Sequence, residues 1–210
     1  ELITPRDPAT DPRFVDLSGH YNVGLQEYPY QTLRPERTLT ETFSKIKPGL
    51  NTFGEVEFDV RGLVALEGKE TKLAAGQAEL SRRVTGIQVG QTAKAIHLLH
   101  GAGWGSMDPH GTCIGKLVVN YEDGESQTIE INAGEHVRDW FLSNISKRQV
   151  SGGKLVWANP SKEVLEARKS PMFGSISLKE KSLPILYNRE TSFVLEWSCV
   201  FTESLCSFGF

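Results

Sequence analysis

Side chains capable of chemistry are densest near the middle of the chain, where His97, His100, Trp104, Asp108 and His110 lie close together in sequence. Histidine and aspartate are metal ligands, and the spacing of His100, Asp108 and His110 leaves a metal site open across a glycine-rich loop. His97 and His100 are three residues apart, a spacing that places them on opposite faces of a strand. We therefore predict no metal site and interpret His97 as a hydrogen-bonded core residue.

Trp104 lies in the glycine-rich sequence GAGWG at 101–105. This sequence lacks the Lys-Ser/Thr pair and the helix start of a phosphate-binding loop, which excludes that function. We expect Trp104 in a loop at a strand end, where an exposed indole offers a flat face for stacking on a sugar ring. The alternative is that the Trp104 side chain folds back and caps the core.

A second polar group, Arg138, Asp139 and Trp140, follows a predicted hairpin. A guanidinium, a carboxylate and an indole are the group types that a carbohydrate site needs. The alternative is that Arg138 and Asp139 pair to hold a loop. Asp59 and Arg61 are two apart on one predicted strand, so they share a face and suit either role. The predicted ligand-binding residues are His100, Trp104, Arg138, Asp139 and Trp140.

Motifs typical of catalysis are missing from the sequence, which contains no Gly-x-Ser-x-Gly, no His-Glu-x-x-His and no Cys-x-x-Cys. Two carboxylates cannot be assigned as an acid and a base without knowing their separation. We therefore favour a binding module over an enzyme, predict no catalytic residues and no cofactor, and rank a hydrolase below both non-catalytic interpretations.

Composition limits the class of partner. The chain has 210 residues, of which 39% are hydrophobic, and a net charge of −3, which argues against nucleic acid and against an electrostatically held membrane surface. No apolar segment reaches the roughly 18 residues of a membrane helix, so we expect no membrane insertion, and no signal-peptide pattern is present. Three cysteines are too few for a disulfide framework. Because the chain begins at Glu1, we expect a cloned fragment or one domain of a longer protein, whose other domains would be its partners.

The elements that position these residues are predicted to be strands. Six of the ten prolines fall in the first fifty residues, among apolar residues such as Phe14 and Tyr21, which predicts an extended arm over residues 1–50 packed on the domain. Residues 51–210 are predicted to form one all-β domain with minor helix, an antiparallel two-sheet β-sandwich. Its strands are predicted at 56–66 with a kink at Arg61-Gly62, at 84–89, 93–99, 155–157 and 193–201, and in a hairpin at 116–131 around Glu122-Asp123-Gly124. Weaker patterns predict short helices at 71–83 and 161–169.

Five motifs occur in order along residues 4–160: FDVRGLV at 58–64, VTGIQVG at 84–90, IHLLHG at 96–101, IGKLVVNYEDG at 114–124 and VRDW at 137–140. Their succession resembles a family of bacterial β-sandwich domains, abundant in Verrucomicrobia and Planctomycetes. These domains look like galactose-binding-like carbohydrate modules appended to glycoside hydrolases and to larger surface or regulatory proteins. The resemblance implies a jelly-roll fold, a carbohydrate ligand and an extracytoplasmic or cell-surface location. It does not extend to 161–210, so no binding residue is carried over there.

We therefore predict a non-catalytic carbohydrate-binding module whose site includes Trp104 and residues 138–140. The alternative is a structural or protein-interaction domain in which these side chains only hold the loops together. Exposed indoles beside a concave polar patch would favour the first interpretation, and two buried indoles would favour the second.

Overall fold

The fold is that of a computed structural model. It describes residues 3–27, 43–68, 80–93, 95–103, 109–137, 150–158, 172–178, 193–199 and 205–209. All regular secondary structure in these ranges is β-strand, and each pair of strands within a sheet is antiparallel. For the described residues, the prediction of an antiparallel all-β fold is thus confirmed. The helix predicted at 161–169 lies outside the described residues, and the one predicted at 71–83 is wrong at its end, because Arg83 begins a strand.

The described strands form three sheets. The smallest sheet pairs β1 (Gly49–Phe53) with β2 (Val56–Val60). The second sheet contains, in spatial order, β4 (Arg83–Gln88), β10 (Phe193–Cys199), β6 (Cys113–Tyr121) and β7 (Ser126–Asn132). The third sheet contains, also in spatial order, β3 (Val64–Leu66), β11 (Leu205–Gly209), β5 (Ile96–Gly103), β9 (Met172–Leu178) and β8 (Lys154–Ala158).

From β3 to β6 and from β9 to β11, successive strands alternate between the two larger sheets. Strands β3 and β5 belong to the five-stranded sheet, whereas β4 and β6 belong to the four-stranded sheet, and β9, β10 and β11 alternate in the same way. As a result, β10 inserts between β4 and β6, and β11 inserts between β3 and β5. The C-terminal strands therefore join early segments that would otherwise lie at separate edges. The sequence predicted β10 as a strand but did not predict β1, β9 or β11.

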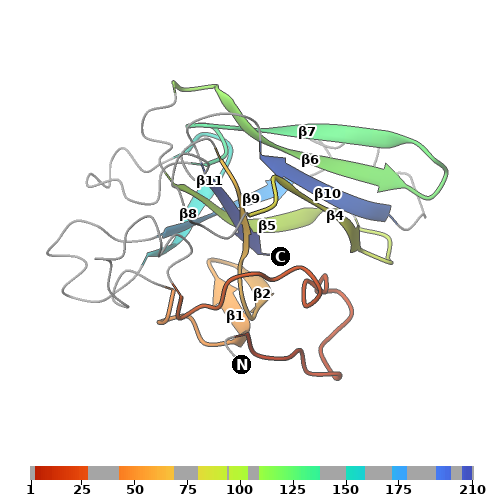
Figure 1. The fold of residues 1–210 in the computed structure, drawn as a ribbon, viewed down its shortest axis with the longest axis vertical. Helices are drawn as coiled ribbons and strands as arrows, with labels where there is room; N and C mark the ends of the chain where they lie inside the picture. The colour runs from red at the N-terminus through yellow and green to blue at the C-terminus, as the bar shows by residue number, and fades with distance from the viewer. Residues whose placement is uncertain are drawn as a thin grey trace, which may run out of the picture.

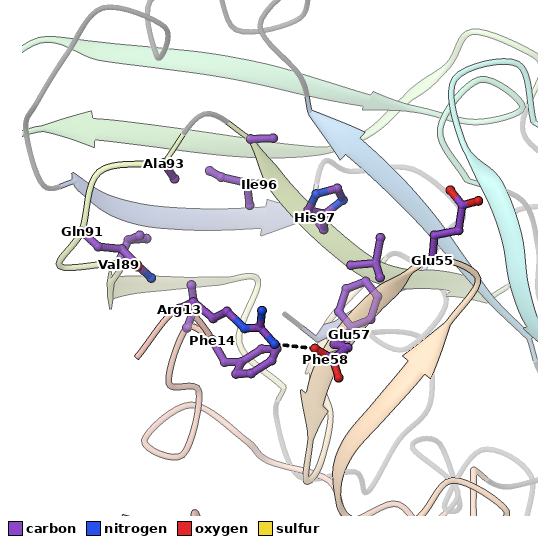
Figure 2. Close-up of a pocket in the computed structure, with 13 residues that line it drawn as sticks. Arg13, Phe14, Glu55, Glu57, Phe58, Val89, Gln91, Ala93, Ile96 and His97 are labelled. Atoms are coloured by element: carbon purple, nitrogen blue, oxygen red, sulfur yellow. Dashed lines mark hydrogen bonds and ion pairs between the residues drawn. The ribbon is translucent and has the colours of Figure 1, made fainter. Parts of the chain in front are cut away.

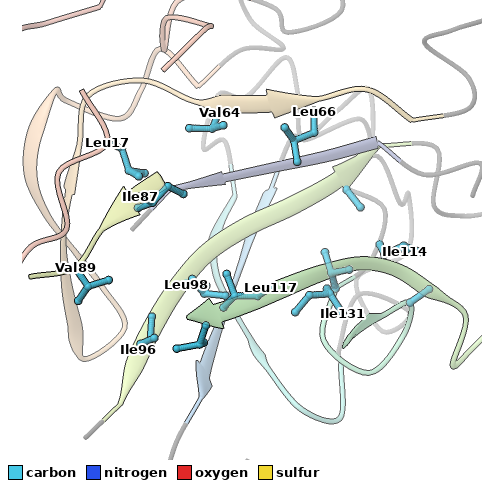
Figure 3. Packing of buried hydrophobic residues seen from close by; sticks show 14 of the residues in the cluster. Leu17, Val64, Leu66, Ile87, Val89, Ile96, Leu98, Ile114, Leu117 and Ile131 are labelled. Carbon is cyan, nitrogen blue, oxygen red and sulfur yellow. The ribbon is translucent and has the colours of Figure 1, made fainter. Parts of the chain in front are cut away.

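The main hydrophobic cluster contains buried residues from both larger sheets. Leu98 of β5 and Leu117 of β6 are fully buried in it, and Figure 3 shows them beside one another between the ribbons. The predicted double-sided burial of the central strand is confirmed, since seven of the eight residues of β5 are buried. Burial of leucine-sized side chains contributes about 1.5–3 kcal/mol each, so this cluster is a principal source of stability.

The N-terminal arm packs on the domain through both side chains and backbone. Asn22 makes two hydrogen bonds with the Ala65 backbone, at 2.8 and 2.7 Å, and Val23 forms a β-bridge with Leu63. Figure 1 shows the arm, in red, running beside β1 and β2 on the side of the molecule opposite the β6–β7 hairpin. The predicted boundary between arm and domain, at residue 50, falls inside β1. The division of the chain into an arm and one domain stays a prediction.

Two details of the predicted strands are corrected. The pattern at 56–66 is not one kinked strand but two strands, β2 and β3, that belong to different sheets. The chain turns between them at Gly62, where a Cβ would lie 3.0 Å from the carbonyl oxygen of Val23. The glycines at 101–103 predicted a loop there. Residues 101–103 instead form the end of β5 and pair with β11.

The predicted β6–β7 hairpin is confirmed, with Asn120 paired to Ser126 next to the turn. Gly124 supplies the positive φ of 87° that the turn requires, a conformation that side-chain-bearing residues rarely adopt.

Candidate functional site

The start of β6 and the end of β7 lie together at one end of the four-stranded sheet. Cys113 is paired with Asn132, and the pairing continues outward through two backbone hydrogen bonds of 2.8 Å that join Ala133 to Gly111 and Thr112. The chain that leads into β6 and the chain that follows β7 are therefore attached at the same place. These two connections carry Trp104 and residues 138–140, respectively.

His100 connects this place to the five-stranded sheet. Its side chain is 1% exposed, and its Nε2 lies 3.2 Å from the carbonyl oxygen of His136, to which a neutral imidazole donates from Nε2. Burial is the main cause that lowers the pKa of His100 to about 4, so the ring is neutral at pH 7. The contact joins β5 to the turn that ends just before Arg138.

The turn itself is held by its own side chains. His136 Nδ1 accepts a hydrogen bond from the Asn132 backbone N–H at 3.0 Å, which places the ring proton on Nε2, and burial lowers the pKa of His136. Glu135 Oε2 accepts from Asn132 Nδ2 at 3.0 Å, and the Glu135 carbonyl accepts from the Gly152 N–H at 2.7 Å. The turn is thus also connected to the segment that leads into β8. These contacts fix the position of the turn from which the chain continues after Val137.

Of the predicted ligand-binding residues, His100 is described, and Trp104, Arg138, Asp139 and Trp140 lie outside the described residues. His100 is enclosed in the core and contacts protein atoms. A direct contact between His100 and a ligand stays a prediction. The prediction that His97 and His100 lie on different faces is confirmed. His97 is half-buried and lines a surface pocket, so the interpretation of His97 as a core residue is wrong. His100, in contrast, is buried and contacts the 132–136 turn.

Asp59 and Arg61 form a buried ion pair that holds the arm. The Arg61 Nε donates to both Asp59 carboxylate oxygens, at 2.9 and 3.0 Å, and Arg61 Nη1 donates to the Pro5 carbonyl. Arg6 lies 3.8 Å from the same carboxylate and donates to the Phe14 carbonyl at 2.9 Å. Of the two roles that the sequence left open for Asp59 and Arg61, the described contacts support the structural one.

The sequence did not point to a pocket of about 340 Å³ between the arm, the β1–β2 hairpin and the β4–β5 connection. Figure 2 shows Arg13 on one side of the pocket, Ile96 and His97 on the opposite side, and Val89 and Gln91 at one end. Its residues come from three segments far apart in sequence, and none of the three carries a recognisable binding motif. A pocket of this kind is found from the tertiary structure alone.

The described ranges contain no group of three or more His, Cys, Asp or Glu side chains that could hold a metal ion. A helix with the length and hydrophobicity to cross a bilayer is likewise not found among them.

Comparison with known proteins identified no relative. No family model matches the chain, and no curated protein and no solved structure is similar enough to count as a match. The galactose-binding-like resemblance therefore stays a prediction, and the function is argued from the described residues.

Proposed function

We propose that this chain is a non-catalytic binding module with a jelly-roll β-sandwich fold and that its ligand is a carbohydrate. The strand order supports the fold, because the two Greek keys of a jelly roll place successive strands in two facing sheets. The sequence of strands from β3 to β6 and from β9 to β11 has this alternation. A hydrophobic cluster with members from both sheets supports their packing face to face.

The pairing of Cys113 with Asn132 carries the proposed site. It attaches the connections that contain Trp104 and residues 138–140 to one end of the domain, and the contact of His100 with His136 braces that end from the other sheet. Loops gathered on a rigid end of a sandwich are common sites of ligand binding. We therefore propose that these two segments lie on the same side of the molecule.

Each proposed contact follows from the chemistry of a pyranose ring, which has apolar C–H faces and a rim of hydroxyl groups. Trp104 and Trp140 supply flat apolar surfaces for the faces. Arg138 donates hydrogen bonds to the hydroxyl oxygens, and the Asp139 carboxylate accepts from hydroxyl groups. His100 contributes by positioning the turn that precedes Arg138.

The proposal is tested on a glycan array, followed by isothermal titration calorimetry with the glycans that bind. Trp104→Ala and Trp140→Ala are each expected to weaken binding about tenfold, because each removes one stacking surface. The control is Trp157→Phe, which keeps an aromatic ring beside Phe43, 5.7 Å away, and should leave the affinity unchanged.

Absence of glycan binding at millimolar concentrations would refute the proposal. Unchanged affinity in both alanine variants would refute the site. If both variants instead lower the melting temperature and leave binding unaltered, the indoles hold the structure together, and the alternative of a structural or protein-interaction domain is favoured.

A further inference from the structure

The four-stranded sheet has an open edge at β7. This strand is the last one in the sheet, with β6 on its inner side, and Figure 1 shows it along the outer margin of the molecule. We propose that this edge binds a second copy of the chain, by antiparallel pairing of the two β7 strands across a two-fold axis. The interaction does not depend on the proposed carbohydrate site, because it involves neither Trp104 nor residues 138–140.

The backbone groups on the open side of β7 follow from its pairing with β6. The Tyr121 N–H donates to the Glu125 carbonyl at 2.8 Å, so Glu125 faces β6. Residues of an antiparallel strand face its two sides in turn. Ser126, Thr128 and Glu130 therefore direct their N–H and carbonyl groups to the open side. All three residues are exposed, and no hydrogen bond to these outward groups is found among the described residues.

The open part of the edge ends at Asn132. The Asn132 N–H donates to His136 Nδ1 at 3.0 Å, and the Asn132 carbonyl accepts from the His136 N–H at 3.0 Å. Residues 126–130 remain open, over about 17 Å of strand with Thr128 at the centre. A two-fold axis beside Thr128 pairs this residue with its own copy and pairs Ser126 with Glu130 of the second copy. This register uses every open backbone group in about six hydrogen bonds.

The other edges of the two larger sheets carry features that hinder pairing with another chain. At β3, the Asn22 side chain bonds to both the N–H and the carbonyl of Ala65. β4 contains Gly86 at a φ of 76°, and the registers of β4 with β10 and of β8 with β9 both shift. In contrast, the register of β7 with β6 is unbroken from Ser126 to Ile131, and β7 contains no proline and no lysine. The edge of β7 is therefore the one best suited to pairing.

The side chains of β7 are complementary to their own copies. On the exposed face, Thr128 lies opposite its copy, and the Ser126 hydroxyl donates to the Glu130 carboxylate of the second copy, which are favourable cross-strand pairs. Glu130 is the one charged residue of β7, and its carboxylate lies 3.3 Å from Lys116 Nζ, so its charge is compensated. On the other face, Ile129 is half-buried against the main hydrophobic cluster, and its diagonal neighbour in the dimer is Ile129 of the second copy.

Sedimentation velocity over a range of concentrations measures the association. A contact this short buries less than roughly 1,200 Å², so we expect a weak dimer with a Kd on the order of 100 µM. At about 1 mM about a fifth of the protomers then remain monomeric, so the amides of Ser126, Thr128 and Glu130 should exchange with solvent about fivefold more slowly than in dilute protein. The amides of Gln127 and Ile129 bond to β6 and should be protected at both concentrations.

Variants at Thr128 test the register. Thr128→Lys places two ammonium groups opposite each other across the axis and should weaken the dimer at least about tenfold. Thr128→Pro removes an outward N–H, leaves the hydrogen bonds to β6 in place and should have a similar effect. The matched control is Thr85→Lys, which makes the same exposed change on β4, at the other edge of this sheet, and should leave the Kd unchanged. An equimolar mixture of Thr128→Lys and Thr128→Glu should associate again, because opposite charges then meet across the axis.

A wild-type chain that stays monomeric at about 1 mM would overturn the proposal. Association that is unchanged in both Thr128→Lys and Thr128→Pro, with native amide spectra, would place the contact elsewhere and overturn the role of β7. If the oppositely charged variants fail to associate when mixed, the two-fold register is wrong. None of these results bears on glycan binding, which is tested at Trp104 and Trp140.

Discussion

Arg61 offers the sharpest test of how the arm is held on the domain. Replacing it by methionine removes two hydrogen bonds to the Asp59 carboxylate, each of which contributes roughly 1.5–3 kcal/mol because both partners are charged. The Asp59 side chain is 2% exposed, so water cannot replace the lost partner. Among the described residues, Arg6 is the remaining cation near this carboxylate, 3.8 Å away.

The expected cost of Arg61→Met is about 3 kcal/mol, at the lower end of the 3–5 kcal/mol typical for breaking a buried pair, because Arg6 compensates in part. For a domain of this size the melting temperature should fall by about 6–12 °C. The free energy of unfolding is measured by urea denaturation. Limited proteolysis should show faster cleavage within residues 3–27, since Arg61 also holds the Pro5 carbonyl.

The control for this prediction is Arg13→Met. It removes an ion pair whose arginine side chain is 58% exposed, and it should cost less than about 1 kcal/mol. The double variant Asp59→Leu with Arg61→Met should be more stable than Arg61→Met alone, because it leaves no unpaired buried charge. A cost below about 1 kcal/mol for Arg61→Met, or a double variant that is no more stable than the single one, would contradict the reasoning.

Two further predictions concern His100 and Gly62. Since the pKa of His100 is lower in the folded protein (about 4) than in the unfolded chain (6.5), the unfolded chain binds its proton first as the pH falls. The free energy of unfolding should therefore decrease from about pH 6.5 to about pH 4, and His100→Gln should flatten this part of a urea-denaturation profile; a parallel profile would contradict the assignment. Gly62→Ala should cost about 1–3 kcal/mol, because the new Cβ would lie 3.0 Å from a backbone oxygen of the arm. Gly19→Ala, with no atom within 4 Å of the added Cβ, should cost less, and equal thermal shifts in the two variants would exclude crowding as the cause.

Local patterns in the sequence predicted much of the strand content. The β6–β7 hairpin was predicted because alternation and a Gly124 turn are encoded by neighbouring residues. β5 was predicted as a central strand because its residues are apolar on both faces. The glycines at 101–103 misled the prediction of where β5 ends, because pairing with β11 keeps this segment extended. That pairing joins segments about a hundred residues apart, which no local pattern encodes.

The roles of the side chains, like the strands, were only partly predictable from the sequence. The sequence by itself determined the all-β class and the segments in which a carbohydrate site is sought, because hydrophobic period and turn chemistry are local properties. Only the tertiary structure decided that Asp59 and Arg61 bind the arm, that His100 is buried against His136, and that a pocket forms beside Arg13. Burial, ion pairing and cavity shape depend on contacts between segments distant in sequence, and these exist only once the sheets and the arm have packed together.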